Sequence, residues 1–370
     1  MHWLAYLFPL LLMGGLYVYD PSQMLSMDWT EILVIVVVAE AIVGGVHALV
    51  RYLGKDIEFL SGYVVTAKHY NAWTERVVYY VTVSDGKGKT RQEQRVRYDH
   101  HPETWEWVLN TGHTSAISEY MFQALVSRWG GRTYYFPTYH PNCVAGGGGN
   151  AVDWDNVTEH IETETYEQRY SNPLDHSNSI FRYEEITPEQ AREKGLYDYP
   201  AIQNMKQEPI QGLGIANDAE QRAFQLLNAM LGKSHQVHFF VLIYDASKGM
   251  TIGEEQRAYW HGGNKNEFTI CLGVEQTDEG TLLRWCNAFS WMDEPVMELA
   301  LESWARDQEG KPLNLIALSD WLSDNVGLWK RKEWKDFAYL PDPMRWWQLL
   351  TIFAAAIVAC VGLCYYIYSY

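Results

Sequence analysis

Positive charge is scarce in this chain, and its scarcity limits the partners that the protein can have. The 370 residues include 29 Lys and Arg against 46 Asp and Glu, a formal net charge of −17 at pH 7. Such a surface would repel the phosphates of a nucleic acid, so we expect no nucleic acid partner. For the same reason we do not expect the polar part of the chain to lie flat on anionic lipid.

Cysteine is also scarce, and no catalytic signature is recognisable. The central polar region holds Cys143, Cys271 and Cys286, an odd number without the spacing of metal ligands. This pattern favours a reducing compartment over a disulfide framework. The sequence has no Ser/His/Asp, Cys/His or paired-carboxylate arrangement typical of a hydrolase, so we assign no catalytic residue.

Three hydrophobic runs bracket the polar region, at residues 3–19, 29–52 and 346–368. About 20 apolar residues in a helix span the hydrocarbon core of a bilayer. The second and third runs meet that length, and the first is marginal. The first run has neither a basic n-region nor an A-x-A-like site, so we expect a retained helix; the alternative is a signal peptide.

Lys and Arg residues predict the orientation. The loop 20–28 has two Asp and no basic residue. The basic residues that flank the runs all lie toward the polar region: Arg51, Lys55, Lys330, Arg331, Lys332, Lys335 and Arg345. By the positive-inside rule, this predicts a cytoplasmic polar region in an integral protein of a bacterial inner membrane or a plasma membrane.

The polar region changes composition near residue 212. The first part predicts an antiparallel sheet, with strands at 57–70 and 75–84, a hairpin turn at 84–90, and a returning strand with one solvated face. Apolar residues at helical spacing predict a helix over 115–129. We therefore expect an α+β domain over residues 54–212.

The second part, residues 213–342, predicts alternating helices and strands. We expect helices at 218–231 (ended by Gly232), 252–260, 295–307 and 315–334, with strands at 235–244, 266–274 and 282–291. This order is typical of an α/β sandwich. The predicted organisation is thus a transmembrane hairpin over 1–53, these two domains, and a transmembrane helix over 343–370.

The second domain resembles the TPM domain, a small α/β module often tethered by a transmembrane helix. The resemblance lies in EEQRAYWHGGNKNEFTICLGV at 254–274, where a helix ending in Trp260 leads through a Gly/Asn/Lys turn to a strand. It implies a tethered α/β sandwich and phosphate-ester hydrolysis with a divalent metal at Asp245. The whole chain is also similar to multi-pass membrane proteins to which no activity is attached.

The turn HGGNKNE is the sharpest candidate for a ligand site. Gly262 and Gly263 would let the backbone approach a ligand, while Asn264, Lys265 and Asn266 offer donors to an anion. The alternative is an ordinary helix stop and turn, because Gly and Asn favour such turns on conformational grounds.

Two further motifs have simpler interpretations. DHHPE at 99–103 offers ligand types that zinc or manganese accepts, but adjacent His side chains in an extended chain point opposite ways. We interpret it as a surface turn before a helix that starts near Pro102. The glycine run 146–149 lacks the helix and Lys of a phosphate-binding loop, so we expect a flexible loop.

Glu40 and His47 are ionisable residues within the second hydrophobic run, seven positions apart and therefore on one helix face. An ionisable group facing lipid costs about 2.5 to 3.5 kcal/mol, so Glu40 should face a partner helix, water or another protomer. Glu40 could serve a proton or ion relay, or a helix-packing hydrogen bond helped by the small Gly44 and Gly45.

These observations predict a membrane-tethered binding or scaffolding protein that presents a cytoplasmic domain to a protein partner or a small anionic ligand. The first alternative is a TPM-like, metal-dependent phosphate-ester hydrolase. The second is a subunit of an oligomeric transporter or channel that uses Glu40. The expected partners are the bilayer and either another protein or further copies of this chain, joined through the membrane helices.

Overall fold

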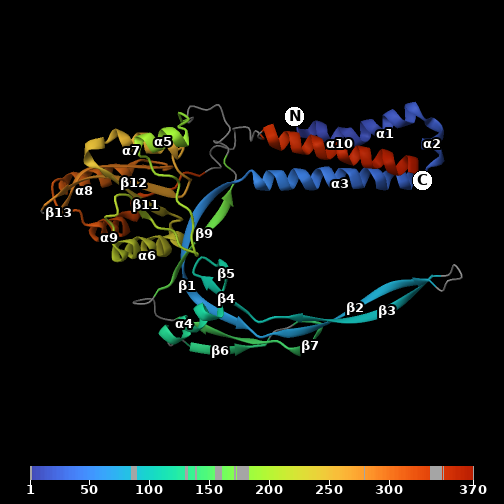
Figure 1. Ribbon diagram of the computed structural model, residues 1–370, viewed down its shortest axis with the longest axis horizontal. Coiled ribbons are helices and arrows are strands. Elements are labelled where there is room, and N and C mark those ends of the chain that lie inside the picture. Colours follow the sequence, from blue (N-terminus) through green and yellow to red (C-terminus); the bar gives the residue numbers. More distant parts are fainter. Residues whose placement is uncertain are drawn as a thin grey trace. The chain divides into compact units, whose positions relative to one another are not determined.

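A computed structural model describes the chain except for residues 1, 85–89, 130–131, 138–139, 155–160, 171, 173–182, 279, 334–343, 345 and 370. The chain forms two compact units (Figure 1). The first comprises Met1–Glu58, Gln168–Glu184 and Lys332–Tyr370, and the second comprises Phe59–Glu167 and Glu185–Arg331. The first unit therefore joins both ends of the chain, and the second contains most of both predicted polar domains.

The first unit is mainly helical. Its helices are η1 (His2–Tyr6), α1 (Leu7–Tyr19), α2 (Pro21–Ser26), α3 (Trp29–Leu53) and α10 (Trp346–Ser369). Two segments, Trp29–Leu53 and Trp346–Ile367, are long and apolar enough to cross a membrane. The apolar segment Trp3–Tyr19 is shorter, so the structure does not confirm it as a third spanning helix.

A buried stripe on α3 forms the packing surface of this unit. Its members recur every third or fourth residue: Ile35, Ala39, Val43, His47 and Val50. Ala39 packs with Ala359 of α10, and Val43 packs with Ala356. Small residues at these positions let helices approach closely, as in membrane helix pairs.

A six-stranded sheet forms one part of the second unit, in the order β5-β4-β1-β8-β6 with β9 also paired to β1. The strands are β1 (Asp56–Tyr70), β4 (Thr104–Leu109), β5 (Thr114–Ile117), β6 (Arg132–Phe136), β8 (Gly149–Asp153) and β9 (Thr163–Tyr170). Helix α4 (Glu119–Trp129) contributes Phe122 and Leu125 to a core with Trp107 and Val152. The antiparallel pairs of β1 with β4 and β8 confirm the predicted sheet type.

Two boundaries in this part differ from the prediction. The start of the predicted 115–129 helix is strand β5, and α4 begins only after Ser118, whose Oγ accepts a hydrogen bond from the Met121 amide. Pro102 is followed by strand β4, so the predicted helix there is wrong. Periodicity alone did not separate a short strand from the first turn of the helix that follows it.

The glycine run joins two strands instead of forming a long loop. Gly146 ends β7 (Cys143–Gly146) and Gly149 begins β8. Gly146 has φ +75°, and a Cβ on it would clash with the carbonyl oxygen of Ala72. The run is therefore required for a tight turn and for close approach of two backbones.

Strands β2 (Trp73–Ser84) and β3 (Thr90–His101) are antiparallel and paired in register over their full lengths, as the sequence predicts. The predicted turn between them falls on residues 85–89, which lie outside the described residues. Figure 1 shows them as a long two-stranded ribbon. Strand β7 pairs with β2 only from Trp73 to Glu75. We call β2 and β3 together the ribbon.

The other part of the second unit is a four-stranded sheet in the order β10-β11-β12-β13. Its strands are β10 (Ile210–Gln211), β11 (His238–Asp245), β12 (Glu267–Thr277) and β13 (Gly280–Ser290). The helices are α5 (Pro188–Lys194), α6 (Asp218–Ser234), η2 (Ala246–Lys248), α7 (Thr251–Tyr259), α8 (Val296–Asp307), α9 (Leu315–Asn325) and η3 (Val326–Leu328). From residue 218 onward, helices and strands follow one another in the predicted order, but the helix predicted over 315–334 ends at Asn325 and is followed by the short η3.

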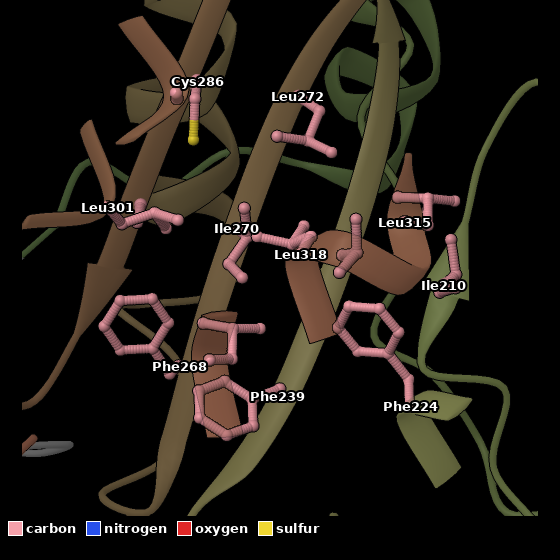
Figure 2. Packing of buried hydrophobic residues seen from close by; sticks show 14 of the residues in the cluster. Ile210, Phe224, Phe239, Phe268, Ile270, Leu272, Cys286, Leu301, Leu315 and Leu318 are labelled. Atoms are coloured by element: carbon pink, nitrogen blue, oxygen red, sulfur yellow. The ribbon is translucent and has the colours of Figure 1, made fainter. Parts of the chain in front are cut away.

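Alternating residues of these strands build a core on one face of the sheet. Phe239, Phe268 and Ile270 pack there with Phe224 of α6 and Leu318 of α9 (Figure 2). Aromatic side chains cover the opposite face, where the ring of Trp260 lies 5.8 Å from that of Phe240. Helices thus cover both faces, and the strands between them are almost wholly buried.

Gly232 does not stop α6, which continues to Ser234. A Cβ on Gly232 would clash with the carbonyl oxygen of Ser61 in β1. Glycine is needed there because α6 and β1 are in close contact. The prediction of a helix stop was therefore wrong about the role of this glycine.

Candidate functional site

The HGGNKNE turn reverses the chain between α7 and β12. His261, Gly262 and Gly263 have φ values of +53°, +84° and +76°. Two of these three left-handed positions are glycines, the residue that adopts this conformation most readily. The backbone conformation therefore accounts for the glycines of this turn without a ligand, which is the alternative given in the sequence analysis.

The side chains of the turn are organised around the buried carboxylate of Glu267. The Asn264 amide N–H donates to Glu267 Oε2 at 2.8 Å, and Asn264 Nδ2 donates to Glu267 Oε1 at 2.8 Å. Tyr199 donates its hydroxyl to the same Oε1. Asn266 Nδ2 donates to the carbonyl of Phe59. The donors proposed for an anion thus bind groups of the protein itself.

Close packing leaves little room in this turn. A Cβ on Gly263 would lie 3.0 Å from Glu267 Oε2. The carbonyl of Gly263 accepts a 3.0 Å hydrogen bond from Trp291 Nε1. Lys265 is half-buried in the same turn. A closed turn with a carboxylate at its centre favours a structural role over the binding of an anion.

Asp245 is fully exposed at the end of β11, where it caps η2. Its Oδ1 accepts hydrogen bonds from the amide and the hydroxyl of Ser247, and these bonds lower the pKa of the carboxyl. In the parallel register, His238 lies beside Glu267 and Asp245 beside Val274. At about 3.3 Å per residue, Asp245 and Lys265 lie more than about 20 Å apart, at opposite ends of the strand pair. The structure does not bring these two predicted site residues together.

Metal ligands do not converge in the part of the chain that the structure describes. No group of three or more His, Cys, Asp or Glu side chains there could hold a metal ion. In DHHPE, His100 Nδ1 lies 3.4 Å from Thr74 Oγ1, while His101 stacks on Trp73 with ring centroids 4.0 Å apart. The other face of Trp73 stacks on His140 at 3.7 Å. His101 and His140 thus pack against an aromatic ring, and the two imidazoles of DHHPE do not form a ligand set.

His47 lies on the packing face of α3, as predicted, and is buried. Its Nδ1 lies 2.7 Å from the hydroxyl of Tyr6 in η1. Glu40 is half-buried on the same helix. A hydrogen bond between helices therefore exists on this face, but His47 makes it, whereas the sequence predicted such a bond for Glu40. Its partner Tyr6 was not identified from the sequence.

A buried histidine was also missed. His238 starts β11, and burial lowers its pKa to about 3. Its Nε2 lies 3.1 Å from Gln207 Oε1, and its Nδ1 lies 3.3 Å from Ser61 Oγ. A neutral ring protonated at Nε2 satisfies both contacts. The Ser61 contact links β11 to β1, and the Gln207 contact links β11 to the segment before β10. No local sequence pattern signals either contact.

The ribbon has no buried residue on either face in the described strands, and its residues are exposed or half-buried. Val78 lies opposite Val96, and the flanking side chains of Tyr80 and Tyr98 share their face. Tyr80 and Tyr98 are each 65% exposed. The opposite face carries Tyr79, which is also exposed. The predicted half-solvated strand therefore has no fully buried face, although Val77, Val81 and Val83 are half-buried.

The two edges of the ribbon differ in charge. On β3, five residues between 90 and 101 are charged: Arg91, Glu93, Arg95, Arg97 and Asp99. On β2, the seven residues from Val77 to Val83 carry no charge. Among the described strands, only β3 pairs with this stretch of β2, so no described strand lies along its second edge.

No protein-family model, curated protein or solved structure matches this chain. The resemblance to TPM domains therefore stays a prediction. Any functional proposal has to rest on the geometry described above.

Proposed function

We propose that this protein is a membrane-anchored binding or scaffolding protein and that the ribbon is its binding element. The observation that carries this proposal is the exposure of Val78, Tyr80, Val96 and Tyr98 together on one face of the ribbon. Large exposed apolar groups in a contiguous patch mark interaction sites, whereas single ones are normal on any surface.

The geometry of the ribbon supports the same proposal. A two-stranded hairpin is marginally stable in water unless another layer covers it. The ribbon has twelve residue pairs, and no described helix or sheet covers the patch. Tyrosine is well suited to a docking surface because it offers a large rigid area and a polar tip. A protein partner that covers this patch would supply the missing layer.

Anchoring follows from the apolar helices. We propose that α3 and α10 span a bilayer and that the shorter segment Trp3–Tyr19 inserts beside them. The flanking Lys and Arg residues favour a cytoplasmic second unit. We also keep the TPM-like sandwich as a proposal for β10–β13 and their helices, where it would act as the rigid base of the ribbon-bearing unit.

The two alternative functions gain no specific support. The hydrolase alternative requires Asp245 and Lys265 in one site, but the strand register separates these two residues. The transporter alternative requires a transport role for Glu40. The polar contact observed on this face of α3 joins Tyr6 and His47, and such a contact stabilises helix packing.

Site-specific photo-cross-linking in membranes tests the proposal. A photoreactive amino acid replaces Tyr80 or Tyr98 in the full chain, and Tyr120 of α4 serves as control because it is 81% exposed. We expect a discrete cross-linked protein product from the two ribbon positions and none from Tyr120. Equal labelling at all three positions, or no product from the ribbon, would overturn the proposal.

A further inference from the structure

The two edge strands of the ribbon differ in how well charged side chains protect them from pairing with another strand. An exposed edge strand offers unpaired N–H and C=O groups to any other strand, and proteins usually protect such edges with charged side chains. β3 follows that rule, with charge at residues 91, 93, 95, 97 and 99. β2 breaks it, since V-V-Y-Y-V-T-V at 77–83 combines high β-propensity with no charge and no proline.

The open part of β2 is also limited in length. β7 occupies the same edge from Trp73 to Glu75, and the Arg76 amide donates to the carbonyl of Asn142. The open edge therefore begins at Val77. It offers seven residues, enough for a strand of ordinary length.

We propose that the Val77–Val83 edge pairs with the same edge of a second copy of this chain. The two β2 strands run antiparallel about a twofold axis at Tyr80, so that a four-stranded sheet β3-β2-β2-β3 forms. This inference rests on the proposed function of the ribbon as a binding element and names its partner and its mode of contact.

The register follows from the symmetry and from the length of the uncharged stretch. Centring on Tyr80 pairs all seven residues, with Val77 opposite Val83 of the partner subunit and Tyr79 opposite Val81 of the partner subunit. Tyr80 then faces Tyr80 of the partner subunit, an aromatic cross-strand pair of a kind that stabilises sheets. No charged side chain lies opposite a like charge between the two β2 strands.

A second copy of this chain fits this edge because the resulting dimer has no further unprotected edge. After β2 pairs with β2, both outer edges are β3 strands, and both are protected by charge. A twofold dimer therefore forms without an open edge that could extend into a fibre. The arginines of the two β3 strands lie three strand spacings apart, about 14 Å, beyond the Debye length of about 8 Å at physiological salt. Their repulsion is screened.

Single-cysteine cross-linking of the full chain in membranes tests the register. Tyr80→Cys places two thiols opposite each other on the twofold axis, within disulfide reach. Gln94→Cys is the matched control, because Gln94 lies directly opposite Tyr80 on the other strand of the ribbon. We expect a disulfide-linked dimer from Tyr80→Cys and only the background of the parent chain from Gln94→Cys.

A charged side chain on β2 tests the mechanism. Val81→Lys, added to Tyr80→Cys, should remove the cross-linked dimer. Adding Tyr79→Glu should restore it, because the carboxylate introduced at position 79 then lies opposite the ammonium introduced at position 81 of the second copy. Arg95→Glu, which changes charge on the protected edge, should leave the dimer unchanged.

The outcomes separate this inference from the proposed function. A Tyr80→Cys chain that stays monomeric, or a Gln94→Cys chain that cross-links as well as Tyr80→Cys, would overturn pairing through β2. If photo-cross-linking at Tyr80 then gives a product with a different protein, the ribbon remains a binding element whose partner is not a second copy.

Discussion

Strands β12 and β2 have nearly the same length and similar residue types, yet their surroundings are opposite. β12 has eleven residues, of which the first eight are buried, and β2 has twelve, none of them buried. β12 has a paired strand on each edge and helices on each face of its sheet, whereas most of β2 has one neighbour. The difference shows that β-propensity predicts a strand but does not reveal whether the strand serves the core or a surface.

This comparison assigns stability to one region and binding to the other. Residues around β12 are completely buried, and removing their atoms leaves cavities. No residue of the two ribbon strands is buried, so changing them should alter little of the core. We therefore expect larger effects on stability around β11–β13 than in the ribbon.

The largest effect is expected from Phe268→Ala in β12. Phe268 is fully buried, and its ring lies 5.8 Å from that of Phe239 in a T-shaped arrangement. Loss of a buried ring costs about 3 to 5 kcal/mol through lost transfer free energy and the cavity left behind. Urea unfolding of the full chain in detergent, followed by tryptophan fluorescence, measures the loss.

Val78→Ala on the ribbon is the matched control, because Val78 is 38% exposed. Its free energy of unfolding should stay within about 0.5 kcal/mol of the parent value. Equal losses for the two variants would contradict the assignment of stability to the β12 region.

The next effect is a dependence of stability on pH through His238. Burial lowers its folded-state pKa to about 3, against about 6.5 for an unfolded histidine. The unfolded state therefore binds an extra proton between these values, and stability falls as pH drops below about 6.5. Between pH 7 and pH 5, His238 should account for a loss of about 2 kcal/mol.

Urea unfolding at both pH values, in the parent and in His238→Gln, isolates this contribution. The variant should be less stable at pH 7 because it disturbs the contacts with Gln207 and Ser61, but its stability should change less with pH. An equal pH dependence in both proteins would show that His238 is not the group responsible.

A smaller effect is expected at the start of α6. Asn217 Oδ1 accepts hydrogen bonds from the amides of Ala219 and Glu220, and the Glu220 carboxylate accepts from the Asn217 amide. Asn217→Ala removes this capping box and should cost about 1 kcal/mol in thermal or urea unfolding. Asn217→Asp keeps the acceptor and should stay close to the parent, so a similar loss in both variants would argue against capping.

The sequence predicted elements well where local chemistry decides them. The order of helices and strands from residue 218 onward, the pairing of β2 with β3 and the apolar helices all follow from periodicity, caps and turn residues. The boundary at Ser118 was missed because three residues of β5, Ser115 to Ile117, continue the helical spacing of α4. A local pattern of apolar residues does not show where a strand ends and the following helix begins.

Long-range contacts explain what the sequence did not predict. Gly232 follows a helical pattern and was interpreted as a stop, although the carbonyl of Ser61, far away in sequence, requires a glycine there. Asn264 and Asn266 were correctly placed in a turn, but their acceptors, the carboxylate of Glu267 and the carbonyl of Phe59, become evident only in the fold. The register that separates Asp245 from Lys265 is also a property of the sheet, not of either segment.

The smallest effect on stability is expected from Tyr98→Ser, which sharpens the comparison between the two strands. Tyr98 is 65% exposed and lies opposite Arg76, so its removal leaves no cavity. The free energy of unfolding should change by no more than about 0.5 kcal/mol. A loss above about 1 kcal/mol would mean that Tyr98 packs against another part of the protein, and the ribbon would then resemble β12. If the loss stays small while Tyr98→Ser weakens photo-cross-linking from position 80, the exposed aromatic face serves binding and contributes little to the fold.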